Sequence, residues 1–193
     1  MKHETNFEEK ISLSSDNAYK RAKLADIVPL KQPLVVDFTP STFCNLKCIF
    51  CLHSSEKKVY EKIKNKQLDL NVFKKAIDGM KEFDEKLKCI HFGGAGEPLI
   101  NKNVAKMIEF AKKSGVAENI DIFTNGILLN QKNSDLLLDS GVDFIRISVN
   151  GLSGMDFEKN TGFNLNFEKY IENISYLKFP VFGPRRPARA GRR

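Results

Sequence analysis

Cys44, Cys48 and Cys51 lie within eight residues of one another, separated by three and then by two residues. Thiolates are soft ligands that select iron–sulfur clusters, zinc or copper. A four-iron cluster usually takes four thiolates, so a loop that supplies three leaves one iron open to a substrate or cofactor. The short spacing also lets one loop wrap three corners of such a cluster. These residues therefore predict a metal centre with one coordination position left open.

Zinc is the alternative metal, because His53 follows two residues after the last cysteine. Structural zinc sites usually pair ligands from two separated segments, however, and the sequence contains no second cysteine pair.

Cys89 shares a predicted strand face with His91, which could suggest a second metal, although free cysteines are commonly buried as small hydrophobes. The N-terminus has no apolar signal segment, so the clustered cysteines favour a metal over disulfides and indicate a cytoplasmic protein.

The net charge of +7 is concentrated at the end of the chain, where five arginines fall within the last nine residues. Removing those five charges from +7 leaves +2 for the rest, which is close to neutral. Such a weak field does not favour nucleic-acid binding by the domain, although the tail could contact phosphates non-specifically. No run of residues has the apolar length of a membrane span. We therefore expect neither a nucleic-acid-binding nor a membrane protein.

The elements that position these groups alternate between strands and helices. Short β-rich runs predict strands at residues 34–38, 87–92, 119–123 and 142–149. Apolar residues at three- and four-residue spacing predict helices at 69–83, 102–114 and 167–177, and a helix through 136–138 that ends at Gly141. This alternation implies right-handed βαβ units and a parallel sheet. Because a closed eight-stranded barrel needs about 250 residues, the predicted fold is α/β, a partial (β/α) TIM-like barrel with about four βα units.

The apolar stripe of each helix predicts the side that faces the core. In the helix at 69–83 the stripe consists of Val72, Phe73, Ala76, Ile77, Met80 and Phe83. In the helix at 102–114 it consists of Val104, Met107, Ile108 and Ala111. In the last helix it consists of Phe167, Tyr170, Ile171, Ile174 and Leu177.

Three segments are expected along the chain: an N-terminal helical extension at 1–32, a core at 33–182 and a basic Pro/Arg tail at 183–193. The core is rich in Lys, Asn, Ile and Phe, whereas the tail is rich in Gly, Pro and Arg. Either the tail is a native disordered segment, or it is artefactual and the chain ends in mid-fold, for example through a frameshift. The second interpretation is favoured, because four βα units leave an unfinished sheet edge.

Three further motifs follow the later strands: Gly96-Glu97-Pro98, Thr124-Asn125-Gly126 and Ser148-Val149-Asn150-Gly151. Each is unremarkable alone, since Glu97 could cap the following turn and the second motif could be an ordinary turn. Together with the cysteine loop, however, they all stand at carboxyl ends of predicted strands, where the active sites of such folds lie. The sequence therefore predicts one site at this rim.

Cys-x3-Cys-x2-Cys, with Phe50 directly before the last cysteine, resembles the signature of the radical SAM superfamily. Gly96-Glu97-Pro98 is similar to the family's Gly-Gly-Glu-type motif, with Ala95 where the first glycine often stands. The two later motifs resemble the family's third-strand turn and fourth-strand ending. The resemblance runs from Val35 to about Lys178. The segment Phe-Gly-Gly-Ala-Gly-Glu-Pro-Leu resembles sequences of the subgroup that often carries a C-terminal SPASM or twitch extension. By this resemblance the chain would be truncated before that extension.

The resemblance implies a [4Fe–4S] cluster on Cys44, Cys48 and Cys51, with S-adenosylmethionine (SAM) bound at the open iron through its amino and carboxylate groups. It implies an oxidoreductase that cleaves SAM reductively to a 5′-deoxyadenosyl radical, which abstracts hydrogen from a substrate. An external electron donor of the flavodoxin or ferredoxin type is expected. The substrate class, whether peptide, small molecule or glycan, cannot be read from these residues, and no catalytic side chain is assigned.

The residues that the resemblance assigns to SAM are Phe50, Gly96, Glu97, Thr124, Asn125, Ser148 and Asn150, and Arg146 is added to them as a hypothesis from strand alternation. Phe50 is expected near the adenine, and Glu97 with the backbone at Gly96 is expected to hold the methionine ammonium. The residues of the third-strand turn line the pocket, and the polar residues after the fourth strand meet the ribose hydroxyls or the carboxylate. If these point inward, alternation along the strand points Arg146 inward too, as a cation for that carboxylate.

Two other functions compete with this interpretation. The first is a truncated, non-catalytic fragment that binds an iron–sulfur cluster, because the family draws its remaining strands and most substrate contacts from later segments. The second is a zinc-binding interaction module with a basic tail for nucleic acid.

Overall fold

The computed structural model describes residues 29–51 and 66–177. Most of the expected N-terminal extension, His53 and the Pro/Arg tail lie outside the described residues. The chain divides into two compact units, Met1–Leu34 and Val35–Arg193, and every element below belongs to the second.

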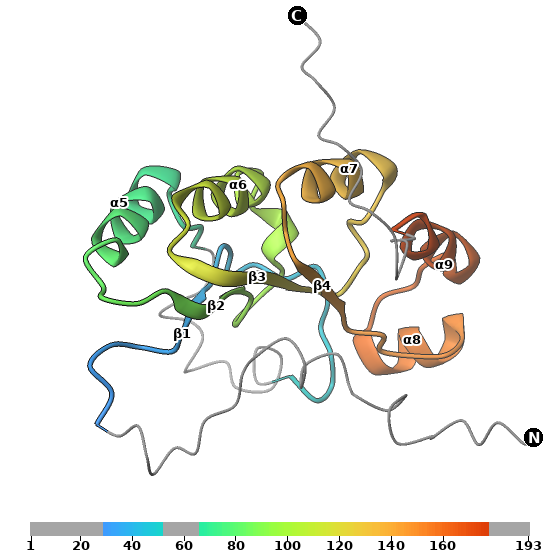
Figure 1. The fold of residues 1–193 in the computed structure, drawn as a ribbon. Coiled ribbons are helices and arrows are strands. Elements are labelled where there is room, and N and C mark those ends of the chain that lie inside the picture. Colours follow the sequence, from blue (N-terminus) through green and yellow to red (C-terminus); the bar gives the residue numbers. More distant parts are fainter. Residues whose placement is uncertain (1–28, 52–65, 178–193) are drawn as a thin grey trace, which may run out of the picture. The chain divides into compact units, whose positions relative to one another are not determined.

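Four parallel strands form one sheet in the order β1-β2-β3-β4 (Figure 1). Their bounds are β1 Val35–Phe38, β2 Leu87–Phe92, β3 Ala117–Thr124 and β4 Phe144–Ile147. Asp37, His91 and Asp121 lie in one row across the first three strands. The predicted parallel α/β fold is confirmed, and its strand and helix order is that of a partial TIM-like barrel.

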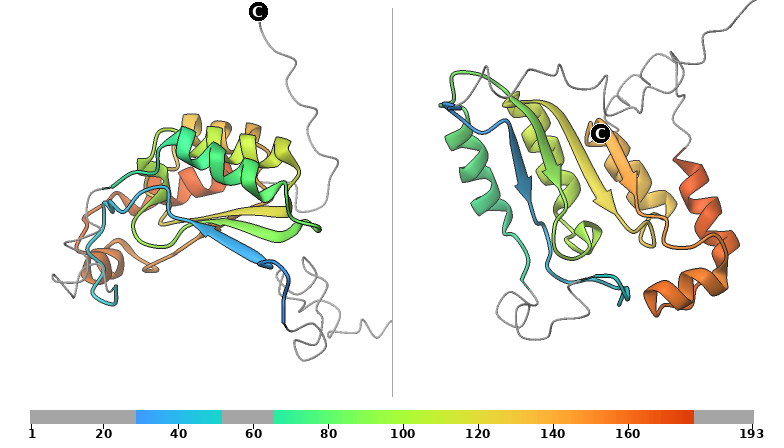
Figure 2. Two further views of the ribbon diagram at one scale, coloured as in Figure 1. Left: turned by 90° about the vertical axis from the view of Figure 1, so that its left-hand side faces the viewer. Right: turned by 90° about the horizontal axis from the view of Figure 1, so that it is seen from below.

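Helices follow the strands along the chain. Their bounds are α5 Leu70–Met80, the 3-10 turn η2 Pro98–Ile100, α6 Val104–Ser114, α7 Gln131–Asp139, α8 Gly154–Thr161 and α9 Phe167–Tyr176. Helices α5, α6 and α7 cover one face of the sheet, whereas α8 lies at the carboxyl ends of the strands, beside the loop after β1 (Figure 2). None of the helices in the described ranges has the length and apolarity that crossing a membrane requires.

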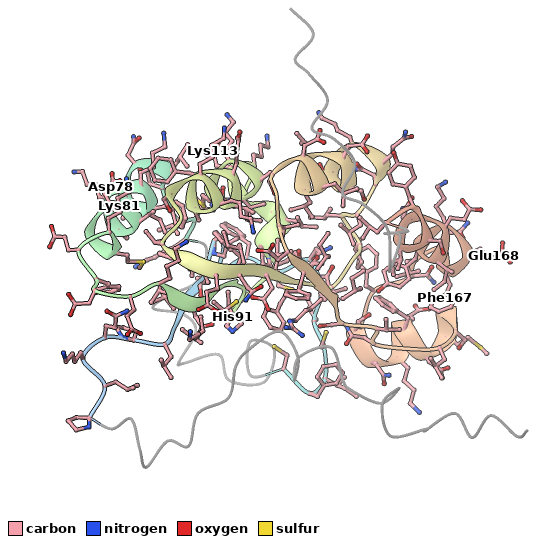
Figure 3. The ribbon with its side chains drawn as sticks, in the orientation of Figure 1. Asp78, Lys81, His91, Lys113, Phe167 and Glu168 are labelled. Atoms are coloured by element: carbon pink, nitrogen blue, oxygen red, sulfur yellow. The ribbon has the colours of Figure 1, made fainter. Side chains whose placement is uncertain are left out.

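The main core lies between the sheet and helices α5, α6 and α7. Phe73 of α5 contacts Phe38 and Phe92, with ring centroids 4.7 and 5.6 Å apart. The strands contribute alternate residues such as Ile90 and Ile122, which are fully buried. Alternation along the strands therefore sends their neighbours to the opposite face of the sheet, and Figure 3 shows His91 projecting on that side.

The predicted core faces are confirmed for α6, in which all four stripe residues are buried and Gly115 ends the helix with a φ of 70°. In α5, Phe73 and Ile77 are buried, but Val72 is 58% exposed, so its predicted core position is wrong. Ile171 of α9 is likewise exposed. In both helices the buried face is narrower than the face that the apolar residues occupy. The reason is that a residue about 100° around the helix from the buried residues lies beyond the surface that contacts the core.

Helix α8 is absent from the sequence-based expectations, and β4 is shorter than the expected strand at 142–149. Ser153 caps α8: its Oγ accepts from the Asp156 N–H at 3.1 Å and donates to the Asp156 carboxylate at 2.7 Å. Gly162 ends the helix in the left-handed region, with a φ of 66°. This Ser-x-x-Asp pattern followed by glycine is a helix signal that was present in the sequence.

Candidate functional site

The cysteine loop follows β1 at the carboxyl end of the sheet. Cys44, Cys48 and Cys51 are partly exposed free thiols. The Leu46 N–H donates to the Cys44 Sγ at 3.5 Å, and the Cys51 N–H donates to the Cys48 carbonyl at 3.1 Å. These two local contacts help to fix the backbone of the loop that carries the three thiols.

The thiols stand close enough to affect one another electrostatically. Burial raises the pKa of Cys48, and the neighbouring Cys44 and Cys51 raise it further. Burial likewise raises the pKa of Cys44, with smaller opposing contributions from its hydrogen bonds. Three adjacent thiolates repel each other, whereas a bound metal cation deprotonates its thiol ligands and compensates their charge. The donor set therefore fits a metal cluster.

The backbone of Gly96 and Glu97 clamps the segment that leads into the cysteine loop. The Glu97 N–H donates to the Phe43 carbonyl at 2.7 Å. Gly96 has a φ of 97°, and a Cβ there would lie 2.4 Å from the Ser41 carbonyl oxygen and 2.6 Å from that of Phe43. Only glycine permits this approach, so the loop after β2 sets the position of the loop after β1.

The Glu97 carboxylate joins the loop after β2 to the end of β3. Its residue is 1% exposed. Oε1 accepts from the Leu99 N–H at 3.1 Å and the Thr124 hydroxyl at 2.7 Å, and Oε2 accepts from the Asn125 N–H at 2.8 Å. Burial raises the pKa of Glu97, and these three hydrogen bonds oppose the shift. Glu97 therefore does cap the turn η2, and it also positions the third-strand motif.

Asn125 brings the third-strand motif into contact with the cysteine loop. Its Nδ2 donates to Asn45 Oδ1 at 2.7 Å and lies 4.0 Å from Cys44 Sγ. Its Oδ1 accepts from the Ile127 N–H, which fixes the side-chain orientation. The motifs after β1, β2 and β3, predicted to share one rim, thus form one hydrogen-bonded network.

Helix α8 supports the cysteine loop from the other side. The Lys47 and Ile49 N–H groups donate to the Thr161 and Asn160 carbonyls, at 2.9 and 3.0 Å. The Asn160 side chain donates to the Asn150 carbonyl at 2.8 Å, which ties α8 to the segment after β4. The sequence-based interpretation missed these supporting residues because it contained no helix here.

Leu46, inside the cysteine loop, packs in a small apolar cluster with Phe157 of α8 and Tyr170 of α9. The rings of Phe157 and Tyr170 lie 5.3 Å apart, and the Tyr170 hydroxyl donates to the Asn125 carbonyl at 3.0 Å. Apolar burial at one residue of the loop and hydrogen bonds at its neighbours therefore hold its backbone.

The remaining predicted SAM contacts stand around this network. Phe50 is 65% exposed, beside the last cysteine. Ser148 is exposed, and its N–H donates to the Thr124 carbonyl at 2.9 Å. Arg146 lies two residues before Ser148, and its Nε donates to Asp121 Oδ2 at 2.7 Å. Ser148 and Asn150 thus lie at the rim, whereas Arg146 is paired within the sheet face below it.

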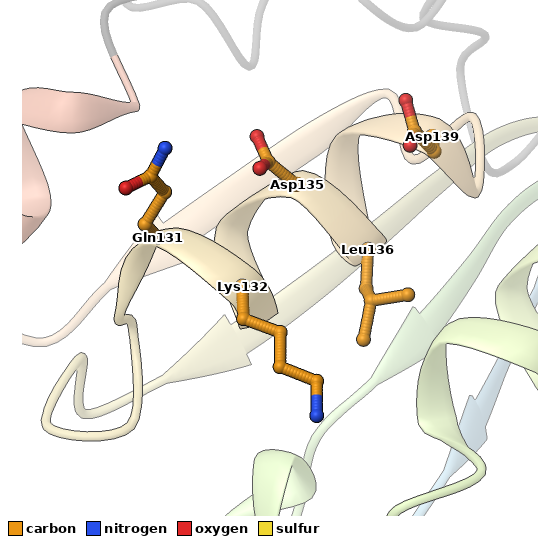
Figure 4. A pocket seen from close by; sticks show the side chains of 5 residues that line it. All are labelled: Gln131, Lys132, Asp135, Leu136 and Asp139. Atoms are coloured by element: carbon orange, nitrogen blue, oxygen red, sulfur yellow. The ribbon is translucent and has the colours of Figure 1, made fainter.

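Two surface hollows lie outside the cysteine loop and the predicted SAM contacts. One, of about 490 Å³, is lined by Gln131, Lys132, Asp135, Leu136 and Asp139 on the outer side of α7 (Figure 4). The other, of about 590 Å³, lies among η2, α6 and α7. Neither contains a cysteine or a residue predicted to bind SAM, so the hollows give no reason to move the site.

Comparison with protein families gives a match to the radical SAM superfamily over residues 38–178. A tungsten-containing aldehyde ferredoxin oxidoreductase cofactor-modifying protein of Pyrococcus furiosus is 35% identical over 109 residues, covering 56% of this chain and 28% of the relative. A GTP 3′,8-cyclase of Clostridium acetobutylicum is 34% identical over 131 residues, covering 68% and 39%. The chain thus spans well under half the length of these relatives.

Solved structures share the fold. Native anSMEcpe with bound AdoMet superposes with a TM-score of 0.59 at 21% identity, covering 76% of this chain and 41% of that one. BtrN in complex with AdoMet and 2-DOIA gives a TM-score of 0.53 at 22% identity, covering 67% and 55%. At these identities the likeness concerns the arrangement of strands and helices.

Proposed function

The chain belongs to the radical SAM superfamily, and on that basis we propose that it is the core of a radical SAM enzyme. The superfamily uses a [4Fe–4S] cluster and SAM. Cys44, Cys48 and Cys51 would hold three irons and leave the fourth for the amino and carboxylate groups of SAM. When bound, these groups supply reductive cleavage of SAM to a 5′-deoxyadenosyl radical that abstracts hydrogen from substrate.

One observation carries this proposal: Asn125 and Glu97 join the ends of β2 and β3 to the loop with the three thiols. A structural zinc knuckle needs only its own ligands, whereas a cofactor that touches the cluster and the strand ends together needs all of these motifs in one place. Within residues 29–51 and 66–177, the fourth cysteine, Cys89, is buried in the sheet. Three donors on the loop and an adjoining polar rim favour the cluster with SAM.

Glu97 and Gly96 are proposed to hold the methionine ammonium. A carboxylate offers about four acceptor positions, and three of those on Glu97 are taken by protein donors. An ammonium at the fourth would place a cation beside a buried anion, the arrangement in which charge-assisted hydrogen bonds are strong. Thr124 contributes by orienting the carboxylate, and Asn125 by facing the cysteine loop.

The other SAM contacts are proposed from their place at the rim. Phe50 offers an exposed ring for the adenine, and Ser148 and Asn150 offer polar groups for the ribose or carboxylate. Arg146 shares the strand face of Ser148 and supplies a positive charge near that carboxylate. An electron donor of the flavodoxin or ferredoxin type, the oxidoreductase class and the SPASM or twitch relationship belong to the same proposal.

The test is SAM cleavage by the chain itself. The chain is reconstituted anaerobically with iron and sulfide, reduced with dithionite in the presence of SAM, and assayed for 5′-deoxyadenosine. Production of 5′-deoxyadenosine that requires both the cluster and the reductant is expected. A cluster without 5′-deoxyadenosine would favour the non-catalytic fragment instead, and retention of zinc without iron uptake would favour the interaction module.

A further inference from the structure

A second polar group of side chains lies on the sheet face opposite α5, α6 and α7. Asp121 of β3 is fully buried and has three partners there. The Cys89 thiol donates to Oδ1 at 3.0 Å, His91 Nδ1 contacts the same oxygen, and Arg146 Nε donates to Oδ2 at 2.7 Å. The chain therefore keeps a charged network on this sheet face, and its carboxylate is fully buried, which costs free energy unless the carboxylate is paired.

The contacts of Asp121 determine which nitrogen of His91 carries the proton. A carboxylate only accepts hydrogen bonds, so Nδ1 is the protonated nitrogen of the neutral ring and Nε2 carries the lone pair. Among the described residues, Nε2 has no hydrogen-bond partner, and the His91 side chain is 23% exposed. The ring is thus held in one tautomer, with its acceptor nitrogen left for another molecule.

Aromatic contacts fix the same ring. Phe123 meets His91 edge to face at 5.5 Å between centroids, and the Arg146 guanidinium stacks 5.5 Å from the Phe123 ring. Phe123 directly precedes the Thr124-Asn125 turn, and His91 lies one residue before the end of β2. This network is therefore on the strand segments that lead directly into the proposed cofactor site.

We propose that His91 is the substrate-side proton acceptor of this enzyme, acting on a substrate with a hydroxyl group at or beside the reacting carbon. The inference rests on the proposed function. The hydroxyl proton moves to Nε2, its O–H bonding electrons remain on the substrate oxygen, and the imidazolium keeps its Nδ1–H bond to Asp121, the carboxylate that it shares with Arg146. A cationic ammonium is the poorer substrate group, because Arg146 already places a positive charge there.

The alternative occupant is a metal ion, since donor atoms of Cys89, His91 and Asp121 lie within 4.8 Å of one another. Two features oppose it. The guanidinium of Arg146 occupies the second oxygen of Asp121 and repels a divalent cation. The Cys89 thiol is completely buried and already donates its proton to Asp121. The network is built to hold a proton on Nδ1, and a metal would have to displace that proton.

The tautomer is measured by long-range ¹H–¹⁵N NMR on the full chain, which has three histidines; loss of signals in His91→Gln assigns the resonance. We expect protonated Nδ1 and unprotonated Nε2, and carbethoxylation of His91 by diethyl pyrocarbonate in the folded chain.

In Asp121→Asn the amide oxygen is drawn to Arg146, so its NH₂ faces His91 and the proton should move to Nε2. Asp143→Asn, which changes a carboxylate bound to Lys112 and the Ile120 N–H, should leave His91 unaffected.

Protonated Nε2 in the unaltered chain, or a His91 that the reagent does not modify, would overturn the proposal. Titration with Zn²⁺ alone supplies the third readout: a shift of the His91 nitrogens at stoichiometric zinc would show a metal site and overturn it too. None of these readouts requires a cluster. The two proposals can therefore fail separately. A chain that shows the expected His91 tautomer but forms no 5′-deoxyadenosine would contradict the proposed function without contradicting the measured state of His91.

Discussion

The side-chain amide of Asn125 donates to Asn45 Oδ1 at 2.7 Å, and this bond joins the turn after β3 to the loop with the three cysteines. The Asn125 backbone N–H meanwhile donates to Glu97. One residue thus connects three segments that are separated by tens of positions in the sequence. The proposed cluster on the cysteine loop and the proposed cofactor site at the strand ends would therefore depend on this connection.

Asn125→Ala should weaken retention of the cluster. The substitution removes the hydrogen bond to Asn45 and the one from the Ile127 N–H. Each is worth about 0.5–1.5 kcal/mol, and loss of the bond to Asn45 alone corresponds to roughly twofold to thirteenfold faster bleaching of the cluster absorbance under an iron chelator. The matched control is Asn133→Ala on α7, which removes an amide donor to the carbonyl of Leu128, a residue that precedes the helix. Equal bleaching rates in the two variants would mean that Asn125 does not hold the cysteine loop.

Gly96→Ala should destabilise the chain far more than an ordinary glycine substitution. Its strained backbone and the clash with the Ser41 carbonyl together should lower the free energy of unfolding by about 3 kcal/mol or more. Gly115→Ala is the control, because Gly115 also has a positive φ but a Cβ there meets nothing within 4 Å. Gly115→Ala should lower the free energy of unfolding only through the left-handed backbone conformation, by about 1–2 kcal/mol. Urea denaturation measures both, and similar losses would argue against the clamp.

Glu97 should make the chain without cofactor less stable as pH rises. Burial raises its folded pKa above the ordinary value of 4.5, so its contribution is fully present below pH 4.5 and is lost as pH rises through the folded pKa. The free energy of unfolding, relative to Glu97→Gln, should fall in that window by at most about 1.4 kcal/mol per pH unit. The glutamine variant cancels the titration of all other groups. A difference that rises with pH would contradict a Glu97 carboxylate whose burial outweighs its three hydrogen bonds.

The four cysteines should behave as two classes on substitution by serine. Cys44→Ser, Cys48→Ser and Cys51→Ser should each abolish reconstitution of a four-iron cluster, because only two thiolates remain on the loop. Cys89→Ser should retain iron and sulfide at the level of the unaltered chain, since Cys89 contacts Asp121 within the sheet. Iron and sulfide analysis after desalting makes the comparison. Iron loss in the Cys89 variant alone would place the metal in the sheet.

Much of the rim could be predicted because it depends on strand ends, and the strands have strong local patterns. The run Leu87–Phe92 contains alternate residues that pack on the helices, and its bounds were predicted as observed. Once the strands are placed, parallel pairing brings the motifs that follow them to one edge. The functional role of each rim residue cannot be obtained in this way, because a motif gives a position and not a contact.

The sequence-based view failed where long-range contacts decide. Helix α8 is short and polar on most sides, so its apolar periodicity is weak, and it owes its place to Phe157 packing on Leu46 and Tyr170. The expectation that Arg146 points inward as a cation for SAM stays a prediction, but its pairing with Asp121 depends on the register between β3 and β4 and was not foreseen. Capping signals would have identified α8, but no local signal reports the register.

Mössbauer spectra of the ⁵⁷Fe-reconstituted chain, with and without SAM, test the proposed cofactor site most directly. With three thiolates on the loop and SAM at the fourth iron, one of the four irons should change its isomer shift and quadrupole splitting when SAM is added, while three remain as they were. Adenosine, which lacks the amino and carboxylate groups of SAM, should leave the isomer shifts and quadrupole splittings of all four irons unchanged. Four irons that stay equivalent in the presence of SAM, or a chain that binds zinc and takes up no iron, would contradict a cluster built to bind SAM.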